Sequence, residues 1–191
     1  MSETLLLQER VRADRHATSY PLIVVGAVGF HYSGAVVATP VDAVYGIPLA
    51  FVIVWALQWR NERRTGVGAG NDETLLMAFG VFLVASAFSL YTWQGLVPRR
   101  LADNVWFWRL VPAAVGIAAI GIRQRSRELA VWGIVIVAGL AVAEAMNEWS
   151  WDIGWSGSSV PYRDLVAQLT FLAVTIAGAV AYRRERALSE S

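Results

Sequence analysis

Three acidic residues at four-residue spacing stand out near the end of a long apolar run. Glu144, Glu148 and Asp152 belong to the stretch AEAMNEWSWDIGW, which also contains three tryptophans. If a helix continued as far as Asp152, this spacing would place the three carboxylates on one helix face. Carboxylates at that spacing repel one another unless a cation faces them, and a charged side chain within a membrane normally has a partner inside the helix bundle. We therefore expect Glu144 to pair with Arg109, which we place at a similar depth in a neighbouring segment.

Further polar side chains are predicted to join this pair in one outward-facing pocket. At a rise of 1.5 Å per helical residue, they fall in the outer half of their apolar segments or in the adjoining loop. Besides Arg109 and Glu144, the predicted ligand-binding residues are His31, Tyr91, Gln94, Asn147, Glu148, Trp151, Trp155 and Gln168. The loop over residues 143–163 contains glycines and a proline, so it can fold back over the pocket as an aromatic lid. Its tryptophans fit a docking surface for a partner equally well.

Each of these features also has a purely structural interpretation. An ion pair such as Arg109–Glu144 can serve only to orient helices, and His31 can hydrogen-bond to a neighbouring helix. Indole side chains prefer the headgroup level of a bilayer, so most of the nine tryptophans are expected in interfacial belts. A ligand site and a structural polar layer both remain open at this point.

The segments that carry these residues are long and apolar. The chain has 191 residues, of which 56% are hydrophobic and only 16% charged, whereas soluble domains contain about 25% charged residues. A helix needs roughly 20 apolar residues to cross a hydrocarbon core of about 30 Å. We therefore predict an all-α fold, a polytopic transmembrane helical bundle that forms one integral membrane domain over residues 1–191. Its six predicted spans cover residues 20–38, 43–59, 75–97, 105–122, 129–149 and 165–182.

The arginines predict how this bundle is oriented. All 16 basic residues are arginines, and with six spans twelve of them fall on one side of the membrane. Only Arg99, Arg100, Arg109 and Arg163 fall on the other side. Because cytoplasmic loops carry the excess of basic residues, both termini are expected in the cytoplasm and the protein is expected in the cell membrane as a multi-pass protein.

The composition excludes several kinds of site. Without cysteine there is no disulfide and no thiolate ligand, and two histidines are too few for a His-rich metal centre. The absence of lysine excludes a retinal Schiff base, and no phosphate-binding loop, nucleophile elbow or zinc-protease motif is found. We expect no metal and no cofactor. The net charge of +1 gives no indication of nucleic-acid binding, because the arginines lie at the membrane edges.

Three functions fit this sequence, and enzymatic activity is left open among them. We favour a small-molecule binding or transport component with the outward-facing pocket. The first alternative is a membrane-embedded enzyme acting on a lipid or isoprenoid, in which Glu144 or Glu148 is the general acid or base and Arg109 holds an anionic headgroup. The second is a structural subunit of a membrane complex, with the loop at 143–163 docked on a partner membrane protein or on a second copy of the chain. In all three, the lipid bilayer surrounds the helices.

Overall fold

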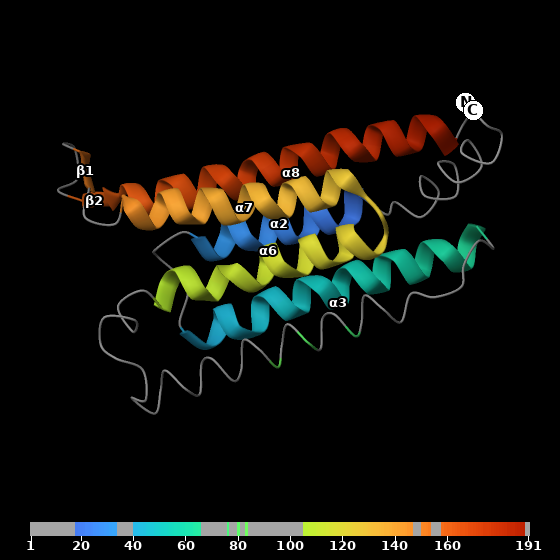
Figure 1. Ribbon diagram of the computed structural model, residues 1–191, viewed down its shortest axis with the longest axis horizontal. Coiled ribbons are helices and arrows are strands. Elements are labelled where there is room, and N and C mark those ends of the chain that lie inside the picture. Colours follow the sequence, from blue (N-terminus) through green and yellow to red (C-terminus); the bar gives the residue numbers. More distant parts are fainter. Residues whose placement is uncertain are drawn as a thin grey trace.

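The computed structural model is a bundle of helices with a short β-hairpin at one end (Figure 1). The structure describes residues 18–33, 40–65, 76, 80, 83, 105–146, 150–153 and 158–189. The helices in this part are α2 (Ser19–Ser33), α3 (Pro40–Thr65), α6 (Val105–Arg123), α7 (Arg127–Ala145) and α8 (Tyr162–Ser189). Strands β1 (Ser150–Ile153) and β2 (Ser158–Pro161) pair antiparallel between α7 and α8. The helical fold class is therefore correct, with this hairpin as an addition that the sequence did not predict.

The predicted spans match these helices unevenly. The span at 105–122 coincides with α6, whereas α3 and α8 continue beyond their predicted spans by several polar residues. The predicted fifth span at 129–149 is too long, because α7 ends at Ala145 and is closed by Met146 as its C-cap. Of the predicted third span, residues 76, 80 and 83 are helical and the rest lies outside the described residues.

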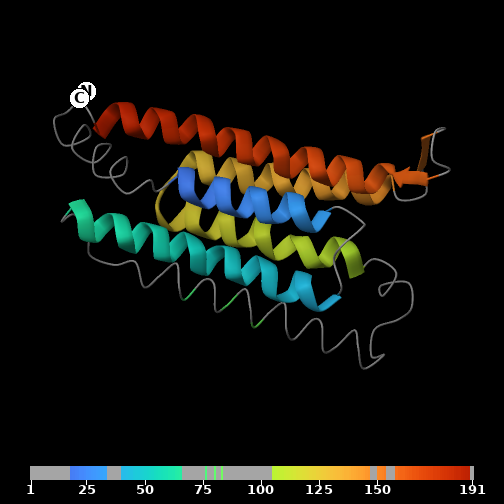
Figure 2. The same cartoon turned by 180° about the vertical axis from the view of Figure 1, so that it is seen from behind.

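The helices pack side by side, and α8 lies along both α2 and α7 (Figures 1 and 2). In addition, α6 packs on α7 and α2 packs on α3. Helices α2 and α7 run toward the end of the bundle that carries the β-hairpin, which we call the hairpin end (Figure 1). Helices α3, α6 and α8 run in the opposite direction, so residues far apart in the sequence meet at each end.

A tight turn joins α6 to α7 at the opposite end of the bundle. Arg125 has a positive φ of 52°, and the Ser126 hydroxyl accepts a hydrogen bond from the backbone N–H of Leu129 at 3.4 Å. This N-cap satisfies one of the free donors at the start of α7, and Glu128 adds a negative charge at the positive end of the helix dipole. Gly121 permits the close approach, because a Cβ there would lie 2.5 Å from the backbone nitrogen of Ala130.

The core runs through the middle of the bundle and depends on close contact between α2 and α8. A Cβ on Gly26 would lie 2.5 Å from the Thr175 hydroxyl oxygen, and a Cβ on Gly29 would overlap the ring of Phe171. Phe171 itself is fully buried. Small residues thus allow two helix backbones to approach within the chain. The largest fully buried side chains are Phe51, Phe171, Leu22, Ile47, Leu110, Ile117, Leu129, Ile136, Leu140, Val25, Val54 and Val174.

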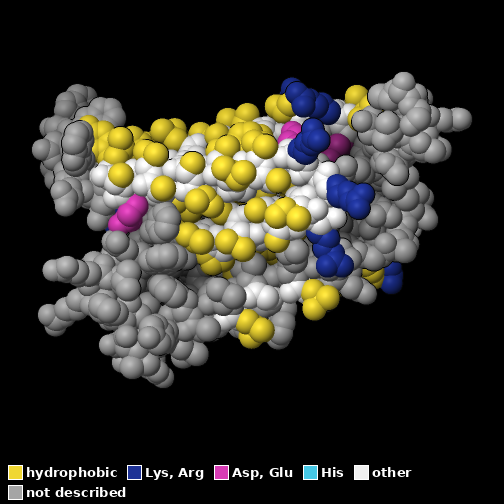
Figure 3. Space-filling view, in the orientation of Figure 1, with side chains coloured by type: hydrophobic (Ala, Val, Ile, Leu, Met, Phe, Trp, Pro, Cys, Tyr) yellow, Lys and Arg dark blue, Asp and Glu magenta, His cyan; other side chains and the backbone are white. Residues whose placement is uncertain are grey.

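The outward faces of the helices are also apolar. Side chains such as Ile134 of α7 and Ile176 of α8 are 67% and 56% exposed, and hydrophobic groups cover the middle of the face seen in Figure 3. Among the described residues, α7 and α8 are long and apolar enough to cross a membrane, and only 28% of each apolar stretch is buried. A helix in the core of a soluble protein would be mostly buried, so this exposure favours a membrane environment.

The end opposite the hairpin is rich in exposed arginine, and we call it the arginine end. The arginines come from the C-terminal part of α3, the turn between α6 and α7 and the C-terminal part of α8. Figure 3 shows basic side chains gathered at this end of the visible face. The exposed members are Arg60, Arg63, Arg64, Arg123, Arg125, Arg127, Arg183, Arg184 and Arg186.

Candidate functional site

The predicted pocket residues are described to different extents. The side chains of His31, Glu144 and Gln168 are described, whereas Arg109 and Trp151 are described by their backbone alone. All five lie toward the hairpin end of the bundle. The other predicted members, Tyr91, Gln94, Asn147, Glu148 and Trp155, lie outside the described residues.

Polar residues of α7 and α8 lie level with one another at the hairpin end. Gly139 of α7 packs against Thr170 of α8, and the two helices are antiparallel. Gln168 lies two residues before Thr170, so it is level with the position two residues after Gly139. Asp164 lies six residues before Thr170, so it is level with the position six residues after Gly139. Glu144 is five residues after Gly139. These three side chains therefore lie within about one helical turn of each other along the bundle axis.

Helix α2 adds an aromatic side chain at the same level. Gly29 packs against Phe171, so Tyr32, three residues later, is level with Gln168, three residues before Phe171. The Tyr32 ring lies against Gly46 of α3, where a Cβ would overlap it. Tyr32 thus occupies the contact between α2 and α3 and brings an aromatic side chain with a hydroxyl group to the polar level.

His31 lies beside Tyr32 but points away from the bundle. Its side chain is exposed, and its ring meets the edge of the Tyr32 ring with 5.2 Å between centroids. The sequence predicts His31 as one of the residues that line the outward-facing pocket. Its outward position gives it no part in the lining that the described side chains form.

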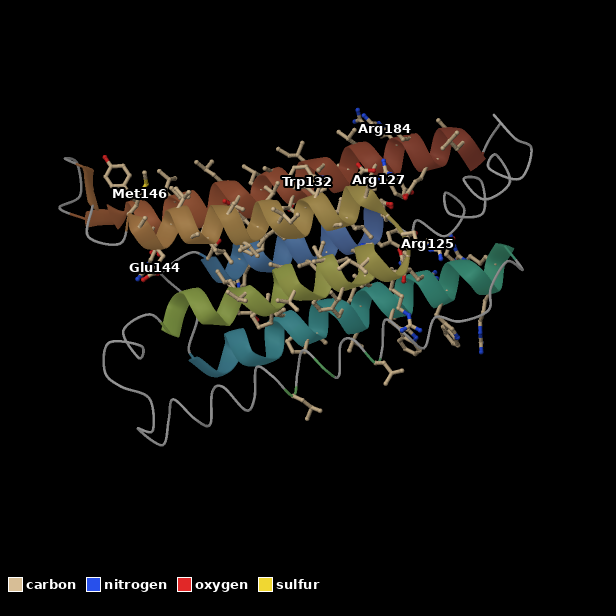
Figure 4. The ribbon with its side chains drawn as sticks, in the orientation of Figure 1. Arg125, Arg127, Trp132, Glu144, Met146 and Arg184 are labelled. Carbon is tan, nitrogen blue, oxygen red and sulfur yellow. The ribbon has the colours of Figure 1, made fainter. Side chains whose placement is uncertain are left out.

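Glu144 faces α6. It follows Gly133 by eleven residues, which is close to three helical turns, and Gly133 packs against Ala118 of α6. Figure 4 likewise draws Glu144 on the side of α7 toward α6, with Met146 on the opposite side. The side chain is partly buried. Its carboxylate therefore lies beside the N-terminal part of α6 at the hairpin end.

Arg109 lies on a different face of α6. It precedes Gly116 by seven residues, or about two turns, and Gly116 packs against Phe51 of α3. The backbone of Arg109 is thus on the side of α6 that meets α3, whereas Glu144 approaches α6 from α7. The two residues share one end of the bundle, and their ion pair stays a prediction.

The acidic series does not share one helix face, because α7 ends before it is complete. Glu144 is in the last turn of α7, whereas Asp152 is in strand β1 opposite Ser159 of β2. Trp151 pairs with Val160 in the same ladder. The condition for aligning the three carboxylates, a helix that continues to Asp152, is therefore not met. Within the predicted loop over residues 143–163, strands β1 and β2 form a hairpin next to the start of α8.

Among the acids whose side chains the structure describes at the hairpin end, Asp164 is the most buried, and the sequence interpretation missed it. The residue is 2% exposed, and its Oδ1 accepts a hydrogen bond from Arg163 Nε at 3.2 Å. Its Oδ2 is buried and finds no hydrogen-bond partner within the described part of the chain. A buried acceptor that lacks a partner is costly, so this oxygen favours the binding of a hydrogen-bond donor.

A second polar cluster, also missed, lies at the arginine end around Glu185. Glu185 of α8 is buried, and its Oε1 accepts a hydrogen bond from the backbone N–H of Thr18 at 3.0 Å. Tyr20 interacts electrostatically with Glu185, Tyr182, Arg60 and Arg64. The first turn of α2 therefore lies between the C-terminal ends of α3 and α8. The arginine end of the bundle therefore contains a buried acid as well as exposed arginines.

A seven-residue spacing along α8 is the sequence feature that could have identified both buried acids. Asp164, Phe171, Gly178 and Glu185 follow one another at this interval on α8, and Phe171 and Gly178 both pack against α2. Over the described ranges, no group of three histidine, aspartate or glutamate side chains comes together to hold a metal ion. The described side chains at the hairpin end can therefore bind a ligand through hydrogen bonds and through the charge of their carboxylates.

Comparison of the chain with family models, curated proteins and solved structures finds no match. The functional assignment therefore depends on the geometry of the two ends.

Proposed function

We propose that the chain is a multi-pass protein of the cell membrane that binds a small molecule at its hairpin end, as a binding or transport component. In this arrangement the six predicted spans cross the bilayer, the arginine end and both termini are cytoplasmic, and the hairpin end faces outward. The exposed apolar faces of α7 and α8 and the gathering of arginines at one end support this orientation.

One observation carries the binding proposal: Asp164 presents a buried carboxylate oxygen without a hydrogen-bond partner in the described part of the chain, at the same level along the bundle as three other polar side chains. Tyr32, Glu144 and Gln168 are partly buried at that level on three different helices. Binding pockets combine an apolar lining with a few convergent polar groups. The apolar core next to this level and the unused Asp164 acceptor match that description.

The charge of these side chains indicates the class of ligand. Glu144 and Asp164 are acids, and Tyr32 adds an aromatic ring. A small molecule with an amine or another hydrogen-bond donor, attached to a flat apolar body, would bind both the acceptor and the ring. Arg109, Trp151 and the predicted residues outside the described part complete the proposed lining.

Native mass spectrometry of the protein, extracted gently from its own membrane, tests this proposal. We expect one small molecule per chain, retained by the wild type and lost in Asp164→Asn. The matched control is Glu128→Gln, which removes a carboxylate from an exposed site at the arginine end and should keep the ligand.

Other outcomes would contradict the proposal in distinct ways. A co-purifying protein bound to a chain without ligand would favour the complex subunit. Conversion of added lipid or isoprenoid by the purified chain would favour the enzyme. Equal ligand loss in Asp164→Asn and Glu128→Gln would show that the ligand binds elsewhere.

A further inference from the structure

The outer face of α3 carries a continuous exposed stripe that changes from apolar to basic along its length. Leu49, Val52 and Ile53 are exposed hydrophobic side chains, and Trp59 follows with 41% of its surface exposed. Arg63 lies one turn further along, with its guanidinium 3.7 Å from the centre of the Trp59 ring. Residues at these intervals share one face of a helix.

The length of the stripe matches half of a bilayer. From Leu49 to Arg63 there are fourteen residue steps, or about 21 Å of helix. One leaflet, including its headgroups, is roughly 20–22 Å thick. If Arg63 lies at the phosphate level, the exposed aliphatic side chains lie along the acyl chains of the same leaflet.

The aromatic part of the stripe is held in place by a second indole. Trp55 stacks on Trp59 with 6.0 Å between ring centroids and an interplanar angle of 21°. Arg63 covers the Trp59 ring, so its guanidinium is oriented by the cation–π contact. Indole side chains prefer the interface between acyl chains and headgroups, which is where Trp59 falls in this arrangement.

A second arginine extends the basic part of the stripe. Arg60 is exposed one residue after Trp59 and interacts electrostatically with Tyr20 of α2. Guanidinium groups bind phosphate oxygens through paired hydrogen bonds and are more weakly hydrated than ammonium groups. Arg60 and Arg63 together therefore present two phosphate-binding groups directly beyond the apolar stripe.

We propose that this face of α3 binds one anionic phospholipid, with its acyl chain along Leu49–Ile53, its glycerol region at Trp59 and its phosphate on Arg60 and Arg63. This site lies at the arginine end, and the proposal rests on the membrane embedding proposed above but not on a ligand at the hairpin end. The continuity of the apolar stripe with the arginines is what selects a phospholipid over a soluble polyanion, which would make no use of Leu49, Val52 and Ile53.

Lipid binding can be counted on the full chain in detergent by native mass spectrometry. Phosphatidylglycerol and phosphatidylcholine with identical acyl chains are the two probes. We expect one phosphatidylglycerol to bind at concentrations where phosphatidylcholine does not. Arg63→Gln should weaken this binding about fivefold, and the double variant Arg60→Gln/Arg63→Gln about thirtyfold.

The matched control removes two arginines from the same end but from another surface. Arg123→Gln/Arg127→Gln changes the turn between α6 and α7, and it should leave the bound phosphatidylglycerol in place. Equal weakening by the two double variants would overturn the site in favour of a diffuse basic end, and equal binding of both lipids would overturn the anionic preference. Arg63→Gln alone keeps Arg60 and its interaction with Tyr20, so a folded variant with unchanged lipid binding would also overturn the proposal.

Discussion

Asp164 and Glu185 are both buried on the face of α8 that meets α2, one near each end of the helix. Twenty-one residue steps separate them, which is about 32 Å of helix. That distance is close to the thickness of the hydrocarbon core of a bilayer, roughly 30 Å. Between Asp164 and Arg183 the sequence LVAQLTFLAVTIAGAVAY contains no charged residue, and Arg183 and Arg184 directly precede Glu185. The two acids therefore mark the limits of the apolar part of this face, and each has a different local role.

Glu185 stabilises the start of α2 from outside that helix. Its carboxylate accepts the N–H of Thr18 and lies at the positive end of the α2 dipole. We expect Glu185→Ala to lower the free energy of unfolding by about 1–3 kcal/mol, because a charged hydrogen bond at a buried site is lost. Thermal unfolding in detergent, followed by circular dichroism, measures this loss.

Glu128→Ala is the control for that variant. It removes an exposed carboxylate from the first turn of α7 at the same end of the bundle. Its cost should be at most about 1 kcal/mol, since only an exposed helix-dipole interaction is lost. Equal destabilisation by the two substitutions would show that Glu185 has no special structural role.

Gly29 is required for the contact between α2 and α8. A Cβ at this position would overlap the ring of Phe171, which is fully buried and has little room to move. We expect Gly29→Ala to destabilise the protein by about 1–3 kcal/mol through overpacking. In a double-mutant cycle, Phe171→Leu should reduce this cost, because the smaller side chain leaves space for the new methyl group.

Gly80 is the matched control for the close approach. It is helical, and a Cβ there would meet no atom within 4 Å. Gly80→Ala should therefore be neutral or stabilise the protein by up to about 1 kcal/mol, as alanine favours a helix. If Gly29→Ala behaved like Gly80→Ala, the close packing of α2 on α8 would be refuted.

Substitution of His31 distinguishes the site around Asp164 from the pocket that the sequence predicted, which included His31. Because its side chain is exposed, we expect His31→Ala to retain the bound small molecule and to change the free energy of unfolding by less than about 0.5 kcal/mol. Native mass spectrometry of His31→Ala beside Asp164→Asn compares the two positions directly. Ligand loss in His31→Ala with retention in Asp164→Asn would move the site to the outside of α2.

The sequence predicted the helices well where one local property decided them. An apolar run of about 20 residues was enough to place α6 almost residue for residue. The sequence prediction failed at the end of α7. Glu144, Glu148 and Asp152 have the four-residue spacing of a helix face, but α7 ends at Ala145 and the chain turns at Met146. Spacing shows which residues would share a face and contains no information on whether the helix continues.

The buried acids were missed for a different reason. Asp164 and Glu185 lie just outside the predicted span at 165–182, where charged residues are expected to be solvated. The burial of Glu185 involves the start of α2, where the N–H of Thr18 donates to its carboxylate, and α2 approaches α8 closely at Gly26 and Gly29. A contact between helices far apart in the sequence cannot be read from either helix alone.

The proposed membrane arrangement predicts which positions of the chain can be labelled from outside the cell. The chain has no cysteine, so single cysteines can be introduced and labelled in intact cells with a maleimide that does not cross membranes. Ser159→Cys in β2 should react from outside the cell. Arg125→Cys, exposed in the turn between α6 and α7, should react only after the membrane is opened.

A third position distinguishes a membrane helix from an exposed helix of a soluble protein. Ala179 of α8 is exposed on the surface of the bundle, so Ala179→Cys would react readily if water surrounded it. In the proposed membrane arrangement this position lies among acyl chains, because the neighbouring exposed side chains Ile176 and Val180 are apolar. We therefore expect that the maleimide does not label Ala179→Cys, even after the membrane is opened. Reaction of Ala179→Cys there, or reaction of Ser159→Cys and Arg125→Cys from the same side, would contradict the crossing of the membrane by α7 and α8.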